Sequence, residues 1–191
     1  MTQPTIRVAG ASGFWGDSAK ATRQLLEVPD LDYIVYDYLA EITMSIMARA
    51  RAKDPAQGYA RDFISAAVVP NLQTISDRGV KVISNAGGVN PEACAAALRA
   101  AIAEKGFDLK VACIIGDDLL PYIETLGESG LAEMFTGDDF PDSERVLSAN
   151  AYLGAFPVAA ALSAGADIVV TGRCVDSAVT LGACLYAFGW E

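Results

Sequence analysis

The sequence predicts an α/β protein in which a mostly parallel sheet is covered by helices on both faces. Short apolar runs alternate along the chain with longer segments of helical character, which is the pattern of parallel strands joined by crossover helices. Several of these runs are continuously apolar, as in strands buried on both sides. The length of 191 residues suits one domain, so we expect residues 1–191 to form a single α/β domain. A Rossmann-like, doubly wound sheet is the first interpretation, and part of a β/α barrel is the alternative.

The first half of the chain contains three units of a strand followed by helices. Strands are expected at residues 5–9, 32–36 and 79–83, and helices at residues 17–26, 39–53, 59–69, 71–77 and 91–104. The strands are short runs rich in Val, Ile and Tyr. Pro55 ends the second helix, because a residue before proline avoids helical backbone angles. Asn90 and Pro91 begin the last one, as the N-cap and the first helical residue.

The second half continues the alternation. Strands are expected at residues 109–115, 146–153 and 167–171, helices at residues 117–126, 156–163 and 176–188, and a loop at residues 128–144. Asp117 is expected to cap the first of these helices. No charged residue occurs between Val146 and Ala166, which is long enough to span a membrane, but Pro157 and several polar residues interrupt this stretch. We therefore interpret it as a buried strand followed by a buried helix.

The composition excludes several function classes. The formal net charge is −10, so neither nucleic acid nor an anionic membrane surface is an expected partner, because both are bound mainly through Lys and Arg. The chain has no histidine, which excludes a Ser-His-Asp triad, a Cys-His dyad and a His-ligated zinc site within it. Acid–base chemistry therefore falls to Asp, Glu, Lys, Tyr or Cys. The four cysteines lie in apolar stretches without a CxxC pair, as in a cytoplasmic protein with reduced thiols.

Ligands of this fold class bind at the carboxyl ends of the strands, where this sequence places polar and glycine-rich segments. Gly10, Ser12, Gly13 and Gly16 follow the first expected strand and precede a helix. Glycines in this position let backbone N–H groups approach a phosphate. Asp37 stands 21 positions after Gly16, close to the spacing of the ribose-binding acid in dinucleotide-binding folds. The alternative is a tight turn that holds no ligand.

A second polar segment follows the third expected strand. It contains Asn85, Gly87, Gly88 and Asn90, which combine two side-chain amides with flexible glycines and the start of a helix. Such groups suit a carboxylate or phosphate oxygen, so all four are candidate ligand-binding residues. A capped loop without a ligand is the alternative.

Three acids, Asp37, Glu41 and Asp117, are the candidate catalytic residues. Asp37 and Glu41 are four positions apart and would face one site if the helix started at Tyr38. Neighbouring carboxylates can have their pKa values pushed apart, which gives one acid and one base. Asp117 and Asp118 are candidate ligands for Mg²⁺, or could share a proton. Ordinary acids at helix starts are the alternative for both pairs.

The last expected strand is followed by Arg173 and Asp176, the final pair of candidate ligand-binding residues. An arginine just past a strand end suits the clamping of a carboxylate or phosphate. The alternative is that Asp176 pairs with Arg173 and caps the last helix.

Six motifs occur in a fixed order, at residues 10–17, 32–33 with 37–41, 84–91, 116–118, 149–154 and 165–173. This series resembles the N-terminal domain of the acyclic terpene utilisation A-type (AtuA-like) proteins, long treated as a domain of unknown function. The resemblance covers residues 6–190 and adds Asn150, within the fifth motif, to the candidate ligand-binding residues. It carries over no catalytic residue, because the family has no settled reaction.

The resemblance implies a role in the bacterial breakdown of branched terpenoid alcohols and acids through coenzyme A thioesters. The first hypothesis is an enzyme domain acting on a branched acyl-CoA or a related organic acid, with a coenzyme A thioester or Mg²⁺ as the expected ligand. The second is a non-catalytic subunit that assembles with an acyl-CoA carboxylase or another pathway enzyme. The third is a dinucleotide-dependent oxidoreductase. It is opposed by the absence of the Tyr-x-x-x-Lys pair that short-chain dehydrogenases use, since none of the seven tyrosines is followed by such a lysine.

Members of this family are longer than this chain, so the resemblance implies that residues 1–191 form the N-terminal part of a larger architecture. Charged residues make up only 20% of the sequence and hydrophobic residues 52%. A surface built to dock on another domain or copy is expected to be apolar. We therefore expect an exposed apolar patch near the last helix, covered in a homo-oligomer or by a C-terminal domain.

Overall fold

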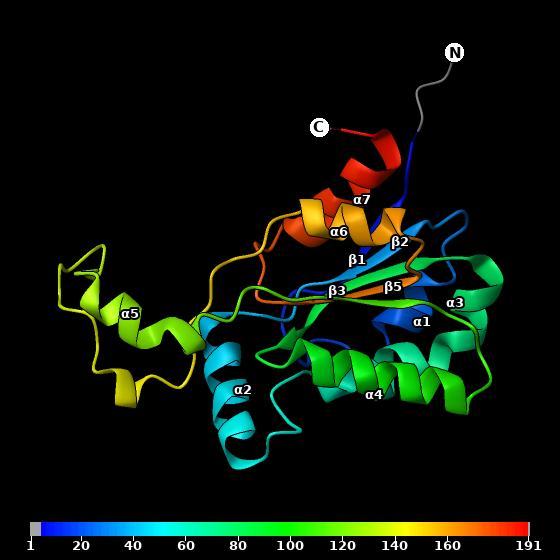
Figure 1. The fold of residues 1–191 in the computed structure, drawn as a ribbon. Coiled ribbons are helices and arrows are strands. Elements are labelled where there is room, and N and C mark those ends of the chain that lie inside the picture. Colours follow the sequence, from blue (N-terminus) through cyan, green and yellow to red (C-terminus); the bar gives the residue numbers. More distant parts are fainter. Residues whose placement is uncertain (1–4, 191) are drawn as a thin grey trace.

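The computed structural model describes residues 5–190, which fold around a five-stranded sheet whose strands all run parallel (Figure 1). The strands are β1 (Val8–Ser12), β2 (Tyr33–Tyr36), β3 (Lys81–Gly88), β4 (Val111–Ile114) and β5 (Ile168–Gly172), in the order β1-β2-β3-β5-β4. Every residue of β2 and β5 is buried, as the continuous apolar runs require. The predicted α/β class with a parallel sheet is confirmed.

Helices cover both faces of this sheet. In the described part of the chain they are α1 (Ala21–Leu25), α2 (Glu41–Lys53), α3 (Leu72–Arg78), α4 (Pro91–Glu104), α5 (Ile123–Glu128), α6 (Phe156–Ser163) and α7 (Ala178–Phe188), with a π-helical segment, Phe63–Val68, ahead of α3. In Figure 1, α6 and α7 lie on one face of the sheet and α1, α3 and α4 on the other. The chain changes face on its return from edge strand β4, through α6, to β5.

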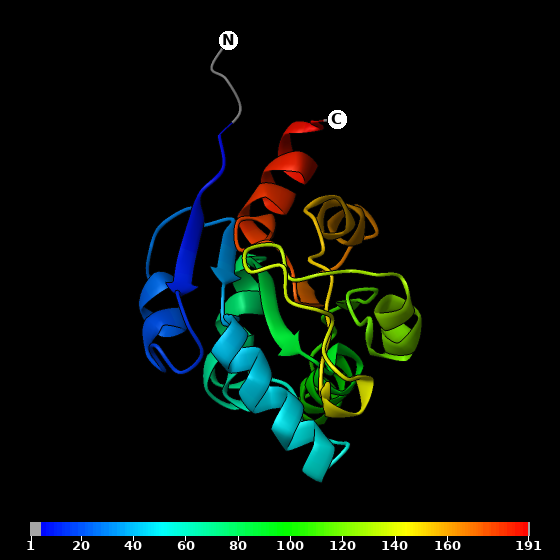
Figure 2. The same ribbon diagram turned by 90° about the vertical axis from the view of Figure 1, so that its left-hand side faces the viewer.

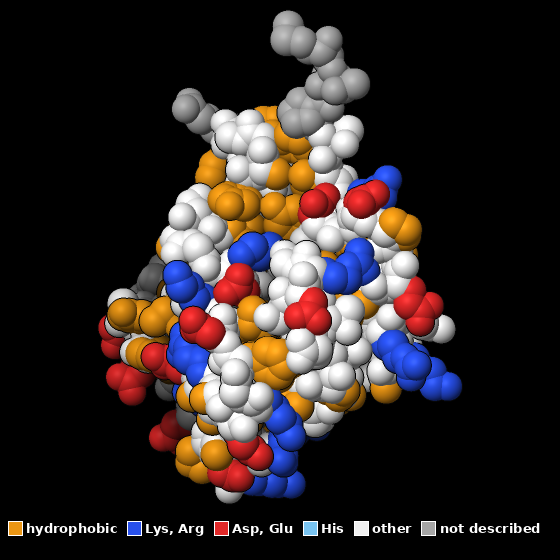
Figure 3. Space-filling model, turned by 90° about the vertical axis from the view of Figure 1, so that its right-hand side faces the viewer, with side chains coloured by type: hydrophobic (Ala, Val, Ile, Leu, Met, Phe, Trp, Pro, Cys, Tyr) orange, Lys and Arg blue, Asp and Glu red, His pale blue; other side chains and the backbone are white. Residues whose placement is uncertain are grey.

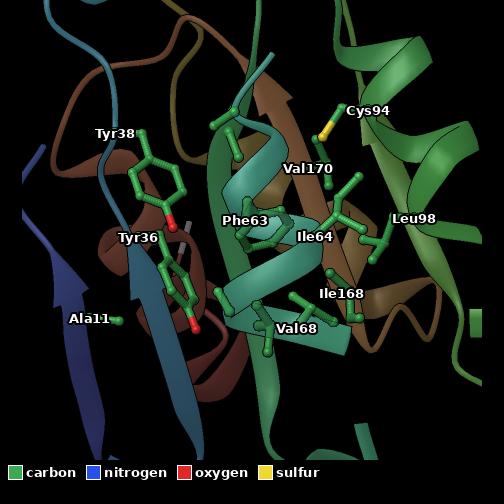
Figure 4. Packing of buried hydrophobic residues seen from close by; sticks show 14 of the residues in the cluster. Ala11, Tyr36, Tyr38, Phe63, Ile64, Val68, Cys94, Leu98, Ile168 and Val170 are labelled. Carbon is green, nitrogen blue, oxygen red and sulfur yellow. The ribbon is translucent and has the colours of Figure 1, made fainter. Parts of the chain in front are cut away.

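The first hydrophobic core lies between the sheet and the π-helical segment (Figure 4). The ring of Phe63 meets that of Tyr36 edge-on, with the centroids 5.3 Å apart, and also contacts Tyr38. The hydroxyl of Tyr36 is buried but lies 2.7 Å from the hydroxyl of Thr22, so its hydrogen-bonding capacity is satisfied. This packing fixes the end of β2, and with it the position of Asp37.

The second core lies on the other face, between the sheet and helices α6 and α7. Gly182 allows the two helices to approach closely, because a Cβ at this position would overlap the side chain of Val158. The helices therefore hold their short loops, and the strand ends that they connect, in fixed positions. Both cores lie behind the carboxyl edge of the sheet and support it.

Three expected bounds in the first half were wrong. The first strand is β1 rather than residues 5–9, and the helix expected at 17–26 shrinks to α1, because the glycines and acids before it form turns. The third strand does not end at residue 83 but continues as β3 to Gly88. Its glycine-rich end stays in the sheet because Gly87 lies directly against the backbone oxygen of Thr171, where a side chain would not fit.

Two predictions in the second half were also wrong. Residues 146–153 form no strand, and only Asn150 and Leu153 make isolated bridges there. Asp117 does not cap a helix, because a 3₁₀ turn, Leu120–Tyr122, precedes α5 and Asp117 turns into the protein interior. The segment between β4 and α6 instead extends away from the sheet, as Figures 1 and 2 show.

The prediction of exposed apolar side chains near the last helix is confirmed. Leu181, Tyr186 and Trp190 are exposed on α7 or just beyond it, and Phe156 is exposed at the start of α6. Figure 3 shows hydrophobic side chains gathered in the upper part of that view, at the height of α7. Neither α6 nor α7 contains a charged residue. Within residues 5–190, no helix combines the length and hydropathy needed to cross a membrane.

Candidate functional site

The carboxyl ends of the strands meet at one edge of the sheet, beside α2 and the segment that follows β4. Figure 2 looks onto this edge, with α2 crossing in front of it. Arg173 lies at its centre, directly after β5, and is only 4% exposed. Its guanidinium donates to the backbone oxygen of Leu39 and to Asp176 Oδ1, both at 3.0 Å. The pairing of Arg173 with Asp176, which the sequence left as one of two alternatives, is present, but Asp176 does not cap α7, whose N-cap position is Ser177 without a side-chain cap hydrogen bond.

The same guanidinium also holds two groups that face solvent. Its second terminal nitrogen donates to the Tyr152 hydroxyl at 2.9 Å and to Glu41 Oε1 at 3.3 Å, and its carbon lies 4.2 Å from the centre of the Tyr152 ring. The Tyr152 hydroxyl in turn donates to Glu41 Oε1 at 2.7 Å. These three residues therefore form one hydrogen-bonded group, supported by a cation–π contact.

This group borders a hollow of about 210 Å³, which is lined by Glu41, Met44, Ser45, Ser148, Asn150, Tyr152 and Arg173. The side chain of Glu41 is 82% exposed, and Tyr152 is 51% exposed. The Tyr152 hydroxyl lowers the pKa of Glu41 below its ordinary value, and Arg173 adds to this effect. The hollow thus combines an ionised carboxylate and a phenol with an apolar side chain.

Asp117, in contrast, is 2% exposed and is hydrogen-bonded to two residues distant in the sequence. Its Oδ2 accepts the backbone N–H of Arg173 at 2.7 Å and the side-chain amide of Asn150 at 2.9 Å. Gly172 leaves room for this carboxylate, because a Cβ there would overlap it. Burial raises the pKa of Asp117 above its ordinary value. Asp117 therefore connects the end of β4 to the end of β5.

Asp118 points away from its neighbour. Its Oδ1 accepts the backbone N–H of Leu120 at 2.9 Å, and its Oδ2 lies 3.5 Å from Arg51. The two adjacent acids therefore bond to different parts of the chain. Among residues 5–190, no group of three or more acidic or thiol side chains is placed to hold a metal ion. This geometry offers the expected Mg²⁺ no third acidic ligand.

Asp37 and Asn85 form a second fixed pair. The buried amide of Asn85 accepts the backbone N–H of Tyr38 and donates to Asp37 Oδ1, both at 2.7 Å. Burial raises the pKa of Asp37. The condition under which Asp37 and Glu41 would face one site, a helix starting at Tyr38, is not met, because α2 begins only at Glu41. Asp37 therefore bonds to Asn85, whereas Glu41 bonds to Tyr152.

Gly10 and Ser12 were expected to follow the first strand but lie within β1, and the loop from Gly13 to Gly16 does not lead directly into a helix. Helix α1 begins at Ala21 and has only five residues, so the helix N-terminus that a dinucleotide-binding loop uses is missing here. The N–H of Gly13 is already bonded to Asp17 Oδ2 at 3.0 Å. Around Gly10, Gly13 and Gly16 there is open space, and Ser12 Oγ is buried without a hydrogen-bond partner in the described residues.

The second glycine-rich segment is held by close packing. Gly88 has a φ of 55°, and a Cβ there would overlap Met47 and Gly58. Asn90 occupies the N-cap position of α4, but its side chain does not cap the helix. Its amide instead donates to the backbone oxygens of Pro55 and Gln57, at 2.9 and 2.8 Å. This amide tethers the loop after α2.

The sequence did not single out Tyr152, nor Met44, Ser45 and Ser148, which also line the hollow. The motif at residues 149–154 contains Tyr152, but the surrounding stretch has no charged residue and resembled a buried strand. Its partner Glu41 lies 111 positions away, so no local spacing connects them. The tyrosine between Asn150 and Leu153 was the only available signal.

Comparison with known families gives this geometry a context. The model of the acyclic terpene utilisation family protein AtuA matches residues 6–191. The chain belongs to the AtuA family. The match spans every residue of the site, from the loop after β1 to Asp176. No curated protein and no solved structure matches the chain.

Proposed function

We propose that this AtuA-family chain is an enzyme domain that moves a proton on a branched, acyclic organic acid or its coenzyme A thioester. The family description supports the substrate class, since it concerns acyclic terpenes. The observation that carries the proposal is the hydrogen-bonded group of Glu41, Tyr152 and Arg173 beside an open hollow. An ionised carboxylate next to a phenol is a pair suited to acid–base chemistry.

In this proposal Glu41 is the base and Tyr152 polarises the substrate. Within residues 5–190, Glu41 uses only Oε1 for its side-chain hydrogen bonds, which leaves Oε2 without a side-chain partner. A substrate carbonyl that takes the Tyr152 hydroxyl away from Glu41 removes the contact that lowers the pKa of this acid. Substrate binding therefore makes Glu41 a stronger base at the moment when it is needed.

The proton comes from the carbon next to the carboxyl or thioester carbonyl. Oε2 of Glu41 accepts it, and the C–H electron pair moves to the carbonyl oxygen as an enolate that the Tyr152 hydroxyl stabilises. Arg173 keeps the phenol in place and offsets the developing negative charge. Asp37 and Asp117 hold the strand ends in this proposal, because both are already bonded to neighbouring groups.

Hydrogen–deuterium exchange on the substrate tests this proposal without knowledge of the overall reaction. The protein is incubated in D₂O with an acyclic monoterpenoid acid or its coenzyme A thioester, and deuterium in the recovered compound is measured by mass spectrometry. We expect exchange with at least one of the two compounds. Glu41→Gln and Tyr152→Phe should each slow it by about 10²-fold or more, while ligand binding measured by calorimetry changes little.

Glu104→Gln is the matched control, because Glu104 is an exposed acid at the far end of α4. It should leave the exchange rate unchanged. Exchange at the wild-type rate in a folded Glu41→Gln variant would overturn the assignment of the base. Absence of both binding and exchange in the wild-type protein would overturn the proposed function.

We also propose that a second copy of the chain covers the face formed by α6 and α7. These helices carry no charge, whereas the whole chain has a net charge of −10. Two copies therefore repel each other at their acidic surfaces, and repulsion is weakest where these uncharged helices meet. The exposed side chains of Leu181, Tyr186 and Phe156 supply apolar area for such a contact.

Light scattering of the purified protein tests this interface. The wild-type protein should be a dimer, and Leu181→Glu should shift it to a monomer. Ile42→Glu is the control, because Ile42 is 73% exposed on α2 and the substitution adds the same charge at a different place on the surface. A monomeric wild-type protein, or equal effects of the two variants, would contradict the proposal.

A further inference from the structure

Two further hollows lie apart from the one beside Tyr152, and the same two stretches of chain contribute to both, with α2 adding Met47 and Ala50 to the first. One stretch is residues 15–23, which follow β1, and the other is residues 57–74, which contain the π-helical segment. The first hollow, of about 520 Å³, is lined by Trp15, Gly16, Met47, Ala50, Gln57, Gly58, Tyr59, Arg61 and Asp62. The second, of about 450 Å³, is lined by Ala19, Lys20, Arg23, Ala66, Pro70, Asn71 and Thr74. No residue is shared with the hollow beside Tyr152.

The first of these hollows is mainly apolar. Trp15, Met47 and Tyr59 provide its largest apolar side chains, and Arg61 is the cation at its wall. The indole N–H of Trp15 donates to Asp62 Oδ1 at 2.6 Å, so the ring is held across the gap between the two stretches. This bond also gives Asp62 Oδ1 a donor. A fixed aromatic wall with few free polar groups suits a hydrocarbon chain.

The second hollow is basic. The side chains of Lys20 and Arg23 are exposed, and neither forms an ion pair within residues 5–190, although the chain has a net charge of −10. No acid lines this hollow, and Asn71 and Thr74 add polar groups. Asp17, the acid nearest to Lys20 in the sequence, is bonded to the N–H of Gly13. Two unpaired cations in a concave, acid-free surface suit phosphate oxygens.

We propose that the two hollows together bind one amphipathic ligand, with an apolar acyclic chain in the first and its phosphate-ester groups in the second. The order of the lining residues supports one continuous ligand. Along the first stretch Trp15 and Gly16 precede Lys20 and Arg23, and along the second Arg61 and Asp62 precede Asn71 and Thr74. The two stretches run side by side, since α1 contacts the π-helical segment.

Two ligand sources share this chemistry, a branched acyl-coenzyme A and an acyclic terpenyl diphosphate. Both join an apolar chain to phosphate esters. The site does not depend on the proposed acid–base chemistry, because it uses none of Glu41, Tyr152 and Arg173. A failure of the proton-exchange experiment therefore leaves this proposal standing, and the reverse also holds.

Titration calorimetry with residues 1–191 tests the site. The probes are a branched acyl-coenzyme A, a terpenyl diphosphate, inorganic diphosphate and the corresponding terpenyl alcohol. We expect one or both phosphate esters to bind more tightly than either inorganic diphosphate or the alcohol. The ester that binds identifies the source. The double variant Lys20→Met, Arg23→Met should weaken ester binding at least about tenfold and leave alcohol binding unchanged.

Two further variants separate the parts of the site. Ala50→Gln places a longer side chain in the apolar hollow and should weaken both the esters and the alcohol. The control Arg49→Met, Lys105→Met removes the same charge from exposed cations that line neither hollow, and should bind like the wild-type protein. Equal ester affinity in the two double variants would overturn the proposal. So would binding of inorganic diphosphate as tight as that of the esters, or no binding of any probe to the folded protein.

Discussion

Asp117 and Glu41 both bond to Arg173, but from opposite sides and in opposite environments. Asp117 is 2% exposed and accepts the backbone N–H of the arginine, whereas the side chain of Glu41 is 82% exposed and accepts from its guanidinium. Burial raises the pKa of Asp117, and the Tyr152 hydroxyl lowers that of Glu41. Two acids that were similar candidates by sequence therefore have different chemistry.

The difference separates a fixed side of the site, which contains the buried Asp117, from an open side, which contains the exposed Glu41 and Tyr152. On the fixed side, a carboxylate that loses its partner is left buried and unsatisfied, which is costly. On the open side, water replaces a lost partner, so Glu41 can exchange Tyr152 for a substrate at little cost. Variants on the fixed side should therefore affect stability most, and variants on the open side should affect chemistry most.

The largest expected effect on stability is at the contact between Gly172 and Asp117. Gly172→Ala pushes a methyl group into the carboxylate of Asp117. This should lower the free energy of unfolding by roughly 1–3 kcal/mol, because a well-packed interior has no room for the added group. Asp117→Ala leaves the Arg173 N–H without its acceptor and should cost a similar amount, roughly 1–3 kcal/mol. Urea denaturation monitored by circular dichroism measures both.

The double variant sharpens this prediction. Once Asp117 is alanine, the methyl group at position 172 no longer meets a carboxylate. The double variant should therefore lose less stability than the sum of the two single losses, by at least about 1 kcal/mol. Strict additivity would show that the carboxylate does not dictate glycine at this position.

A somewhat smaller effect is expected for Asn85→Ala. This change removes the acceptor of the Tyr38 N–H and the donor to Asp37, and it should cost roughly 1–2 kcal/mol, because Asp37 is less deeply buried than Asp117. Asn90→Ala is the matched comparison, since its amide also makes two hydrogen bonds but is partly exposed. The same urea measurement should show the smaller loss for Asn90→Ala, and the reverse order would contradict the division into fixed and open sides.

Local signals in the sequence predicted much of the fold. The bounds of α4 and α6 agree with the expected residues 91–104 and 156–163, because Pro91 and Pro157 mark their first turns. The strands after α1 are also found close to their expected places, since buried parallel strands are continuous apolar runs. Strand β3 was longer than expected. It continues beyond its apolar run to Gly88, and its polar residue Asn85 is hydrogen-bonded to distant partners, Asp37 and Tyr38.

The site was only partly predictable for the same reason. Arg173 and Asp176 are three positions apart, so their pairing was visible in the sequence as one alternative. The contact of Tyr152 with Glu41 joins residues 111 positions apart and depends on how the segment after β4 folds back. Burial, which separates Asp117 from Glu41, is likewise a property of the folded chain and not of a motif.

The stability of the protein should depend on pH through Asp37, which is hydrogen-bonded to Asn85. Burial raises the pKa of Asp37 in the folded protein above its unfolded value near 3.8, so the folded state favours the protonated acid. The contribution of this acid to stability therefore falls as the pH rises from about 4 through the folded pKa. Asp37→Asn, which keeps an oxygen for Asn85, removes this fall, so the variant should gain relative to the wild type as the pH increases.

Urea denaturation at several values between pH 4 and pH 8 measures this trend. Asp108→Asn, at an exposed position before β4, removes the same charge elsewhere and serves as the control. A pH-independent difference for Asp37→Asn would mean that Asp37 ionises as freely in the folded chain as in the unfolded one.

The smallest effect on stability is expected for Tyr152→Phe, on the open side. The phenylalanine ring keeps its place over the Arg173 guanidinium, and only the hydroxyl contacts are lost. Because Tyr152 is 51% exposed, water can replace these contacts, and the loss should stay below about 1 kcal/mol. Tyr152→Ala should cost about 0.5–1 kcal/mol more, since it also removes the cation–π contact. If Tyr152→Phe instead destabilised the protein as much as Asp117→Ala, the hydroxyl would be a structural group. A structural hydroxyl could not leave Glu41 for a substrate, so the proposed rise in the pKa of Glu41 on substrate binding would not occur.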